Sequence, residues 1–104
     1  MMKKKNRHLV CEDGFTVSIQ ASQMNYCEPR DDTGPYVSVE LGYPSAHDSL
    51  IQPWAEDNER PTETVYGWVP SDIVLELITK HGGIKEGELP PMEYAAWDGQ
   101  IPGI

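Results

Sequence analysis

Two segments of the chain alternate between hydrophobic and polar residues, and each predicts a β-strand. Residues 15–20 read Phe-Thr-Val-Ser-Ile-Gln, and residues 36–43 place a hydrophobic side chain at every second position from Val37 onward. Successive side chains of a strand point to opposite faces, so this period of two places one face of each strand against a core.

Two shorter segments extend the predicted sheet. Residues 64–69 are rich in β-branched and aromatic side chains and end at Pro70, which predicts a third strand. Residues 9–11 precede a turn that contains Gly14, a residue that tolerates the positive φ of tight turns. We therefore expect residues 9–11 and 15–20 to form a hairpin.

Residues 71–81 predict the single helix. Ser71 is a suitable N-cap, and Gly82 and Gly83 suit the left-handed backbone that commonly follows a helix. Hydrophobic residues of the segment fall on one stripe at helical spacing. The stripe consists of Ile73, Val74, Leu77 and Ile78.

These elements predict an α+β fold in which a small antiparallel sheet of three to four strands packs against one helix. A chain of 104 residues has room for one such domain. We expect residues 1–8 to be a basic flexible leader and residues 9–84 to be the domain. Residues 85–104 are rich in proline and glycine, and we expect a tail that is disordered or laid along the domain by Tyr94 and Trp97.

The net charge of −9 combines two different segments. Four of the eight basic residues lie in the first seven positions, so from residue 8 onward four basic residues face 17 acidic ones, a balance of −13. A body this acidic repels phosphate backbones, which argues against direct nucleic-acid binding and favours a protein with a basic surface as the partner. With no apolar run long enough for a membrane span or an export signal, we expect a cytoplasmic protein that does not bind membranes.

Catalytic and metal chemistry find little support in the sequence. His8 and Cys11 have a spacing that zinc accepts, and Cys27, His47 or His81 would have to complete the site, but structural zinc sites usually show two close pairs. The two cysteines are expected to be free thiols. Phosphate-binding, nucleophile-elbow and metalloprotease motifs are missing from the sequence. We expect a protein that is not an enzyme and has no cofactor.

A loop rich in turn formers, residues 26–36, carries the strongest binding signal. Its single cation, Arg30, is flanked by aromatic and acidic residues, and aromatic rings elsewhere offer flat surfaces for a partner. The alternative is that these rings simply fill a small core, because Phe15 is the only phenylalanine. The candidate binding residues are Tyr26, Arg30, Asp31, Asp32, Tyr36, Tyr43, Trp54 and Trp68.

Several short motifs resemble small uncharacterised proteins encoded by tailed bacteriophages. They are Gly14–Ser22, Tyr26-Cys27-x-Pro-Arg30, Gly34-Pro35-Tyr36, Gly42-Tyr43-Pro44-Ser45, Tyr66-Gly67-Trp68-Val69-Pro70 and His81-Gly82-Gly83, spread over residues 9–84. The resemblance implies a phage setting, a bacterial cytoplasm or a virion, and it supplies no catalytic residues.

Together these observations predict an accessory protein that occupies another protein, for example a host nucleic-acid-binding or defence factor. Two other functions stay open on the sequence alone. One is a small-ligand binder that uses Arg30 and the aromatic rings for a nucleotide, and the other is a minor structural component of the virion.

Overall fold

The predicted hairpin forms the centre of a sheet in the computed structural model, which describes residues 5–94. Antiparallel pairing joins neighbouring strands in the order β4-β3-β2-β1-β5. The strands are β1 (Leu9–Cys11), β2 (Thr16–Gln20), β3 (Ser38–Gly42), β4 (Val65–Pro70) and β5 (Ile84–Glu86). A short 3-10 helix, η1 (Gln52–Trp54), and the α-helix α1 (Ser71–Lys80) complete the described elements.

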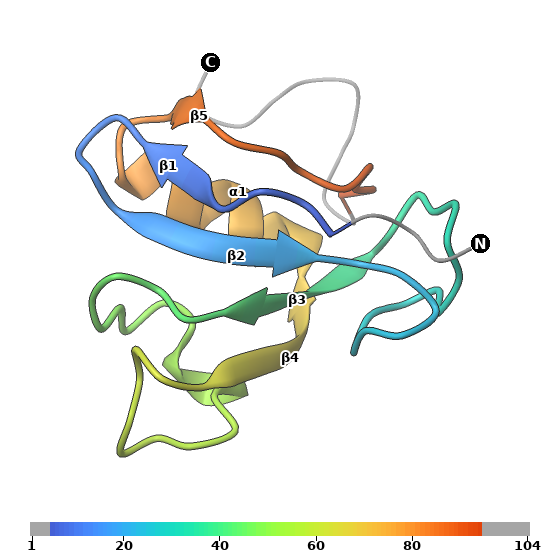
Figure 1. The fold of residues 1–104 in the computed structure, drawn as a ribbon, viewed down its shortest axis with the longest axis horizontal. Coiled ribbons are helices and arrows are strands. Elements are labelled where there is room, and N and C mark those ends of the chain that lie inside the picture. The colour runs from blue at the N-terminus through green and yellow to red at the C-terminus, as the bar shows by residue number, and fades with distance from the viewer. Residues whose placement is uncertain (1–4, 95–104) are drawn as a thin grey trace.

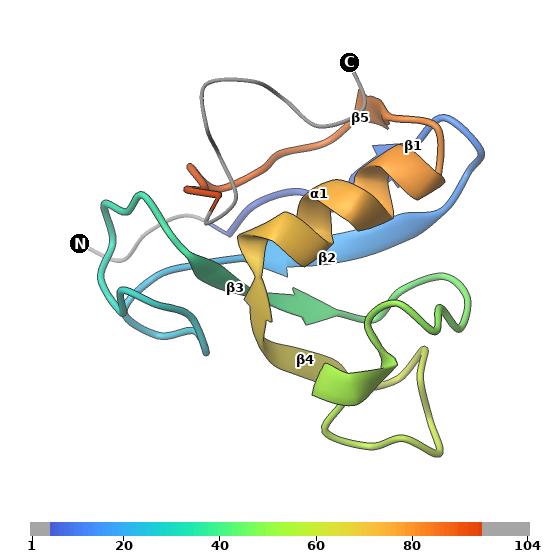
Figure 2. The ribbon, with the colours of Figure 1, turned by 180° about the vertical axis from the view of Figure 1, so that it is seen from behind.

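Helix α1 lies along one face of the sheet, beside β1 and β2 (Figures 1 and 2). The face turned toward the viewer in Figure 1 carries no helix within the described residues. The core is the layer between α1 and the sheet, and the predicted alternation of β2 places Val17 and Ile19 there. Its completely buried members include Leu9, Val17, Ile19, Val39, Leu41, Val69, Val74 and Leu77.

The sheet has five strands, so the expectation of three to four strands was wrong. The extra strand, β5, pairs with β1 through the partners Val10–Glu86 and Cys11–Ile84. All three residues of β5 are exposed, so its sequence carries no alternation that would have predicted it.

The segment that follows β5 runs along the domain as far as the described residues reach. The Tyr36 N–H donates to the Pro91 carbonyl at 2.8 Å, and the Glu93 N–H donates to the Tyr36 carbonyl at 2.7 Å. Met92 packs against the core and forms an isolated parallel bridge with Tyr36. This part of the predicted tail is therefore laid along the domain, whereas Trp97 lies outside the described residues.

Part of the predicted leader is also paired with the domain. Asn6 donates its backbone N–H to the Gln20 side-chain oxygen at 2.8 Å and its Nδ2 to the Ile19 carbonyl at 3.1 Å. The Arg7 N–H donates to Glu88 at 2.7 Å. The bonds of Asn6 explain why Gln20 is buried although the alternation places it on the face away from α1.

Helix α1 begins at Ser71 and ends at Lys80, one residue before the predicted end, and Ser71 does not cap it. Pro70 occupies the N-cap position, and the Ser71 hydroxyl donates to the Tyr36 carbonyl at 2.8 Å, which ties the helix start to the segment before β3. At the other end the Gly83 N–H donates to the Ile78 carbonyl at 2.9 Å, and Gly82 and Gly83 both have positive φ.

Candidate functional site

Trp68 projects from a β-bulge in β4. Val39 pairs with Val69 and Leu41 pairs with Tyr66, so Gly67 and Trp68 together oppose a single residue of β3. The bulge places Trp68 at a φ of 53°, in the left-handed region that bulky residues rarely occupy. Bulges re-aim side chains, and here the side chain is turned outward with 51 % of the residue exposed.

The loop before β3 holds Tyr26 against Trp68. The Trp68 N–H donates to the Tyr26 carbonyl at 3.0 Å, and the Tyr26 N–H donates to Glu40 of β3 at 2.9 Å. The two rings stack with centroids 4.9 Å apart and an interplanar angle of 29°. A Cβ at Gly67 would lie 3.3 Å from the Tyr26 Cβ, so a glycine in the bulge permits this close approach.

Arg30 adds a third flat group to the stack. Its guanidinium carbon lies 5.6 Å from the centre of the Tyr26 ring, which is cation–π distance, and its Nε donates to the Gln23 carbonyl at 3.2 Å. Tyr26, Arg30 and Trp68 are called the aromatic cluster below. They come from a loop and from an edge strand of the sheet, and three of the eight predicted binding residues thus lie together.

The two predicted loop acids mainly shape the loop. The Asp31 carboxylate accepts from the N–H groups of Thr33 at 3.0 Å and Gly34 at 2.9 Å. The Asp32 carboxylate accepts from the backbone and side-chain nitrogens of Gln23, both at 3.0 Å. The bonds of Asp31 are those of an ordinary turn-forming aspartate. The bonds of Asp32 instead join two parts of the loop that are nine residues apart in the sequence.

The other three predicted residues, Tyr36, Trp54 and Tyr43, do not belong to the aromatic cluster. Tyr36 is completely buried and its hydroxyl donates to the Asp31 carbonyl at 2.8 Å, so it belongs to the core and not to a contact surface. Trp54 lies in η1 and packs partly buried against the core. Tyr43 follows β3, is 52 % exposed and has a φ of 52°.

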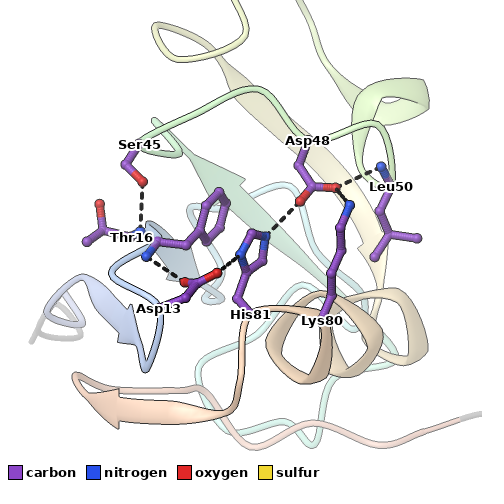
Figure 3. A network of polar contacts seen from close by, with 8 residues as sticks. Asp13, Thr16, Ser45, Asp48, Leu50, Lys80 and His81 are labelled. Atoms are coloured by element: carbon purple, nitrogen blue, oxygen red, sulfur yellow. Dashed lines mark hydrogen bonds and ion pairs between the residues drawn. The ribbon is translucent and has the colours of Figure 1, made fainter.

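A second cluster, which the sequence did not predict, surrounds His81 at the end of α1 (Figure 3). The His81 Nδ1 lies 2.7 Å from an Asp13 oxygen and its Nε2 lies 2.8 Å from an Asp48 oxygen. Lys80 donates to the other Asp48 oxygen at 3.0 Å. The Phe15 ring stacks on the imidazole with centroids 4.0 Å apart. Asp13, Asp48, Lys80 and His81 are called the histidine clamp below.

The contacts of the histidine clamp shift the pKa values of His81 and Asp48. Burial alone would lower the pKa of His81, but its hydrogen bonds to Asp48 and Asp13 raise the pKa above the ordinary value. Burial opposes ionisation of Asp48 as well, yet the bonds from His81, Leu50 and Lys80 lower its pKa. When His81 is protonated, its two ring nitrogens donate to Asp13 and Asp48.

The cysteines and the other histidines belong to no cluster of metal-ligand side chains in residues 5–94. Cys11 and Cys27 are buried free thiols, and burial raises the pKa of each, which outweighs the effect of Arg30 on Cys27. His8 and His47 are exposed. Within these residues no three histidine, cysteine or carboxylate side chains converge as metal ligands would.

Sequence reasoning missed the histidine clamp because its members are distant along the chain. Asp13 lies 68 residues from His81 and Asp48 lies 33 residues from it. The bulge at Gly67 and Trp68 was missed for a related reason, since only the pairing of β3 with β4 reveals it. The adjacent Lys80 and His81 at the helix end were the one available signal, because cations favour that position.

Comparisons with known proteins found no matching family model, no matching curated protein and no matching solved structure. Among the described residues, no helix has the length and apolar character required to cross a bilayer.

Proposed function

We propose that this chain is a non-enzymatic accessory protein that binds another protein, with its acidic body facing a basic surface and the aromatic cluster as the anchor. The setting that we propose is a bacteriophage-infected bacterial cytoplasm. The partner would be a host nucleic-acid-binding or defence factor, whose nucleic-acid surface supplies the positive charge.

The single observation that carries this proposal is the exposed, strained position of Trp68. A tryptophan is the side chain that a small protein gains most from burying, yet this one is half exposed on a backbone with φ of 53°. Bonds to Tyr26 and Glu40 hold the surrounding loop in place. Backbone strain of this kind concentrates at functional sites, and tryptophan and tyrosine are the side chains most enriched in binding hot spots.

The charge of the body supports the choice of a basic partner. From residue 8 onward the balance is −13, and complementary charge accelerates encounter more than it strengthens the final complex. The proposed mechanism is therefore electrostatic steering of a basic protein toward the surface, followed by packing of Trp68 and Tyr26 into it. The internal bonds of Asp31 and Asp32 support the shape of the loop.

An affinity capture from bacterial lysate tests the proposal with three forms of the protein. They are the tagged wild type, Trp68→Ala and the control Ile84→Ala. Ile84 is a matched control because it is also an exposed hydrophobic residue but lies on β5, at the opposite edge of the sheet from β4. Far-UV circular dichroism checks that all three forms are folded.

We expect one basic protein to be captured by the wild type and by Ile84→Ala. Trp68→Ala should weaken its binding by about 2 kcal/mol, or about 30-fold, as for a central hot-spot residue. Capture should also fall as the salt concentration rises from about 50 mM to 500 mM, because screening shortens the reach of the charges. A partner held equally well by Trp68→Ala contradicts the anchor, and tight binding that salt leaves unchanged contradicts the electrostatic step.

A further inference from the structure

We infer that the group which the aromatic cluster receives from its partner is an arginine side chain, stacked on the exposed ring of Trp68. This inference rests on the proposed function and specifies the chemistry of the same surface. It is argued from three features of the described residues: the arrangement of the stack, the charges around it and the contact that the protein already makes with its own arginine.

The stack leaves about half of Trp68 available to solvent. Tyr26 covers part of Trp68 through ring stacking at 4.9 Å, while 51 % of Trp68 stays exposed. The Trp68 backbone is fixed by the bulge and by its bond to the Tyr26 carbonyl, so the ring is presented without a large entropic cost on binding. A preorganised, exposed indole suits a planar group that stacks on its face.

The charges around the stack favour a cationic planar group over a neutral or anionic one. Glu40 opposes the bulge and accepts the Tyr26 N–H, and the loop that carries Arg30 also carries Glu28, Asp31 and Asp32. The loop therefore remains net negative despite its own arginine. Nucleotide phosphates would meet repulsion here, whereas a cation gains from both the carboxylates and the indole face.

The protein itself already makes the contact that we propose for the partner. Arg30 places its guanidinium 5.6 Å from the centre of the Tyr26 ring. An arginine from the partner would make the same kind of contact with the indole of Trp68. Arginine suits this position better than lysine because the guanidinium is planar, delocalised and weakly hydrated, so it loses less hydration when it stacks.

A peptide titration tests the inference separately from the proposed function. Two capped peptides of equal length and charge, one carrying arginines and the other lysines at the same positions, are titrated into the ¹⁵N-labelled full chain. The indole N–H signal of Trp68 is assigned by comparison with Trp68→Phe. The same titrations are repeated with Trp68→Ala and with the control Ile84→Ala, and the dissociation constants are compared.

We expect the arginine peptide to bind more tightly than the lysine peptide and to shift the Trp68 indole signal. Trp68→Ala should weaken the arginine peptide about two- to fivefold and remove the difference between the peptides, whereas Ile84→Ala should preserve both. Equal affinities, an unchanged Trp68 signal, or a preference for arginine that survives in Trp68→Ala would overturn the inference. If Trp68-dependent protein capture persists alongside such a result, the proposed function stands and the arginine assignment fails.

Discussion

Trp68 and Tyr43 share an unusual conformation, since both are aromatic, about half exposed and at positive φ. For an L-amino acid other than glycine, this backbone region costs roughly 1–2 kcal/mol. At Trp68 the cost is offset by defined bonds, because the bulge of β4 lets its N–H reach the Tyr26 carbonyl. At the scale of single residues, exposure of Trp68 is therefore a feature that the surrounding structure maintains.

The strain at Trp68 predicts that glycine is more stable than alanine at this position, the reverse of their usual order in a strand. In the interior of an ordinary strand, glycine is less stable than alanine by about 0.5–1 kcal/mol. At position 68 we expect Trp68→Gly to be more stable than Trp68→Ala by about 1 kcal/mol, because glycine adopts positive φ without strain. Urea denaturation of the two variants measures the difference. A more stable alanine variant would show that the left-handed backbone is not present in solution.

At the scale of elements, the histidine clamp joins three parts of the chain that are distant in the sequence. His81 directly follows α1, Asp13 lies in the β1–β2 turn, and Asp48 lies in the long connection between β3 and β4 (Figure 3). The side chain of Asp48 is only 3 % exposed, so its charge depends on His81, Lys80 and the Leu50 N–H for compensation. We expect this cluster to contribute to stability in a pH-dependent way.

The sign of that dependence follows from the directions of the pKa shifts. The pKa of His81 is raised in the folded protein, so its contribution is complete below the ordinary value of 6.5 and is lost as pH rises through the folded value. The pKa values of Asp13 and Asp48 are lowered. Their contributions to the free energy of unfolding are complete above pH 3.8, the ordinary pKa of an aspartate, and are lost as pH falls through the pKa values of the folded protein.

We predict that His81→Gln lowers the free energy of unfolding by about 2 kcal/mol near pH 5.5, which lies between the ordinary pKa values of aspartate and histidine. The reason is that the substitution removes two charge-assisted hydrogen bonds. The difference from wild type should shrink as pH rises through the folded pKa of His81. Urea denaturation over a pH series measures both quantities. His47→Gln is the matched control, because His47 is exposed, and it should stay close to wild type throughout. A constant difference across the series would mean that His81 is not charged in the fold.

Local patterns predicted the elements well, and long-range pairing accounts for what they missed. The alternation in β2 and the apolar stripe of α1 are properties of neighbouring residues, so Val17, Ile19, Val74 and Leu77 were correctly expected to lie on buried faces. Strand β5 and the bulge at Trp68 exist only through their partners. The burial of Tyr36 could not be predicted either, because the segment that bonds to its backbone, residues 91–93, is distant in the sequence.

At the scale of the whole molecule, the described part of the C-terminal segment is a structural member of the domain. The backbone bonds of Tyr36 with Pro91 and Glu93 connect it to the start of β3, and Arg7 with Glu88 connects it to the N-terminal segment. Leu89 and Met92 pack against the core. The domain thus gathers segments from both ends of the chain around the sheet and leaves the aromatic cluster exposed beside the β4 edge.

A proline substitution at Glu93 tests whether the C-terminal segment stabilises the domain. Glu93→Pro removes the N–H that donates to the Tyr36 carbonyl, while Glu93→Ala removes only an exposed side chain. We expect Glu93→Pro to lower stability by about 1 kcal/mol, since the Tyr36 carbonyl keeps its bond from Ser71, and Glu93→Ala to change stability very little. Thermal denaturation distinguishes the two, and equal melting temperatures would contradict the proposed attachment.

The most direct test of the central claim is site-specific photo-crosslinking in bacterial cells. Benzoylphenylalanine is introduced at Met24, which is 71 % exposed and two residues from Tyr26, or at Ile84 on the opposite edge of the sheet. We predict a single protein adduct from position 24 that disappears when Trp68→Ala is added, and no such adduct from position 84. An adduct that forms equally from position 84, or one at position 24 that does not depend on Trp68, would contradict binding through the aromatic cluster.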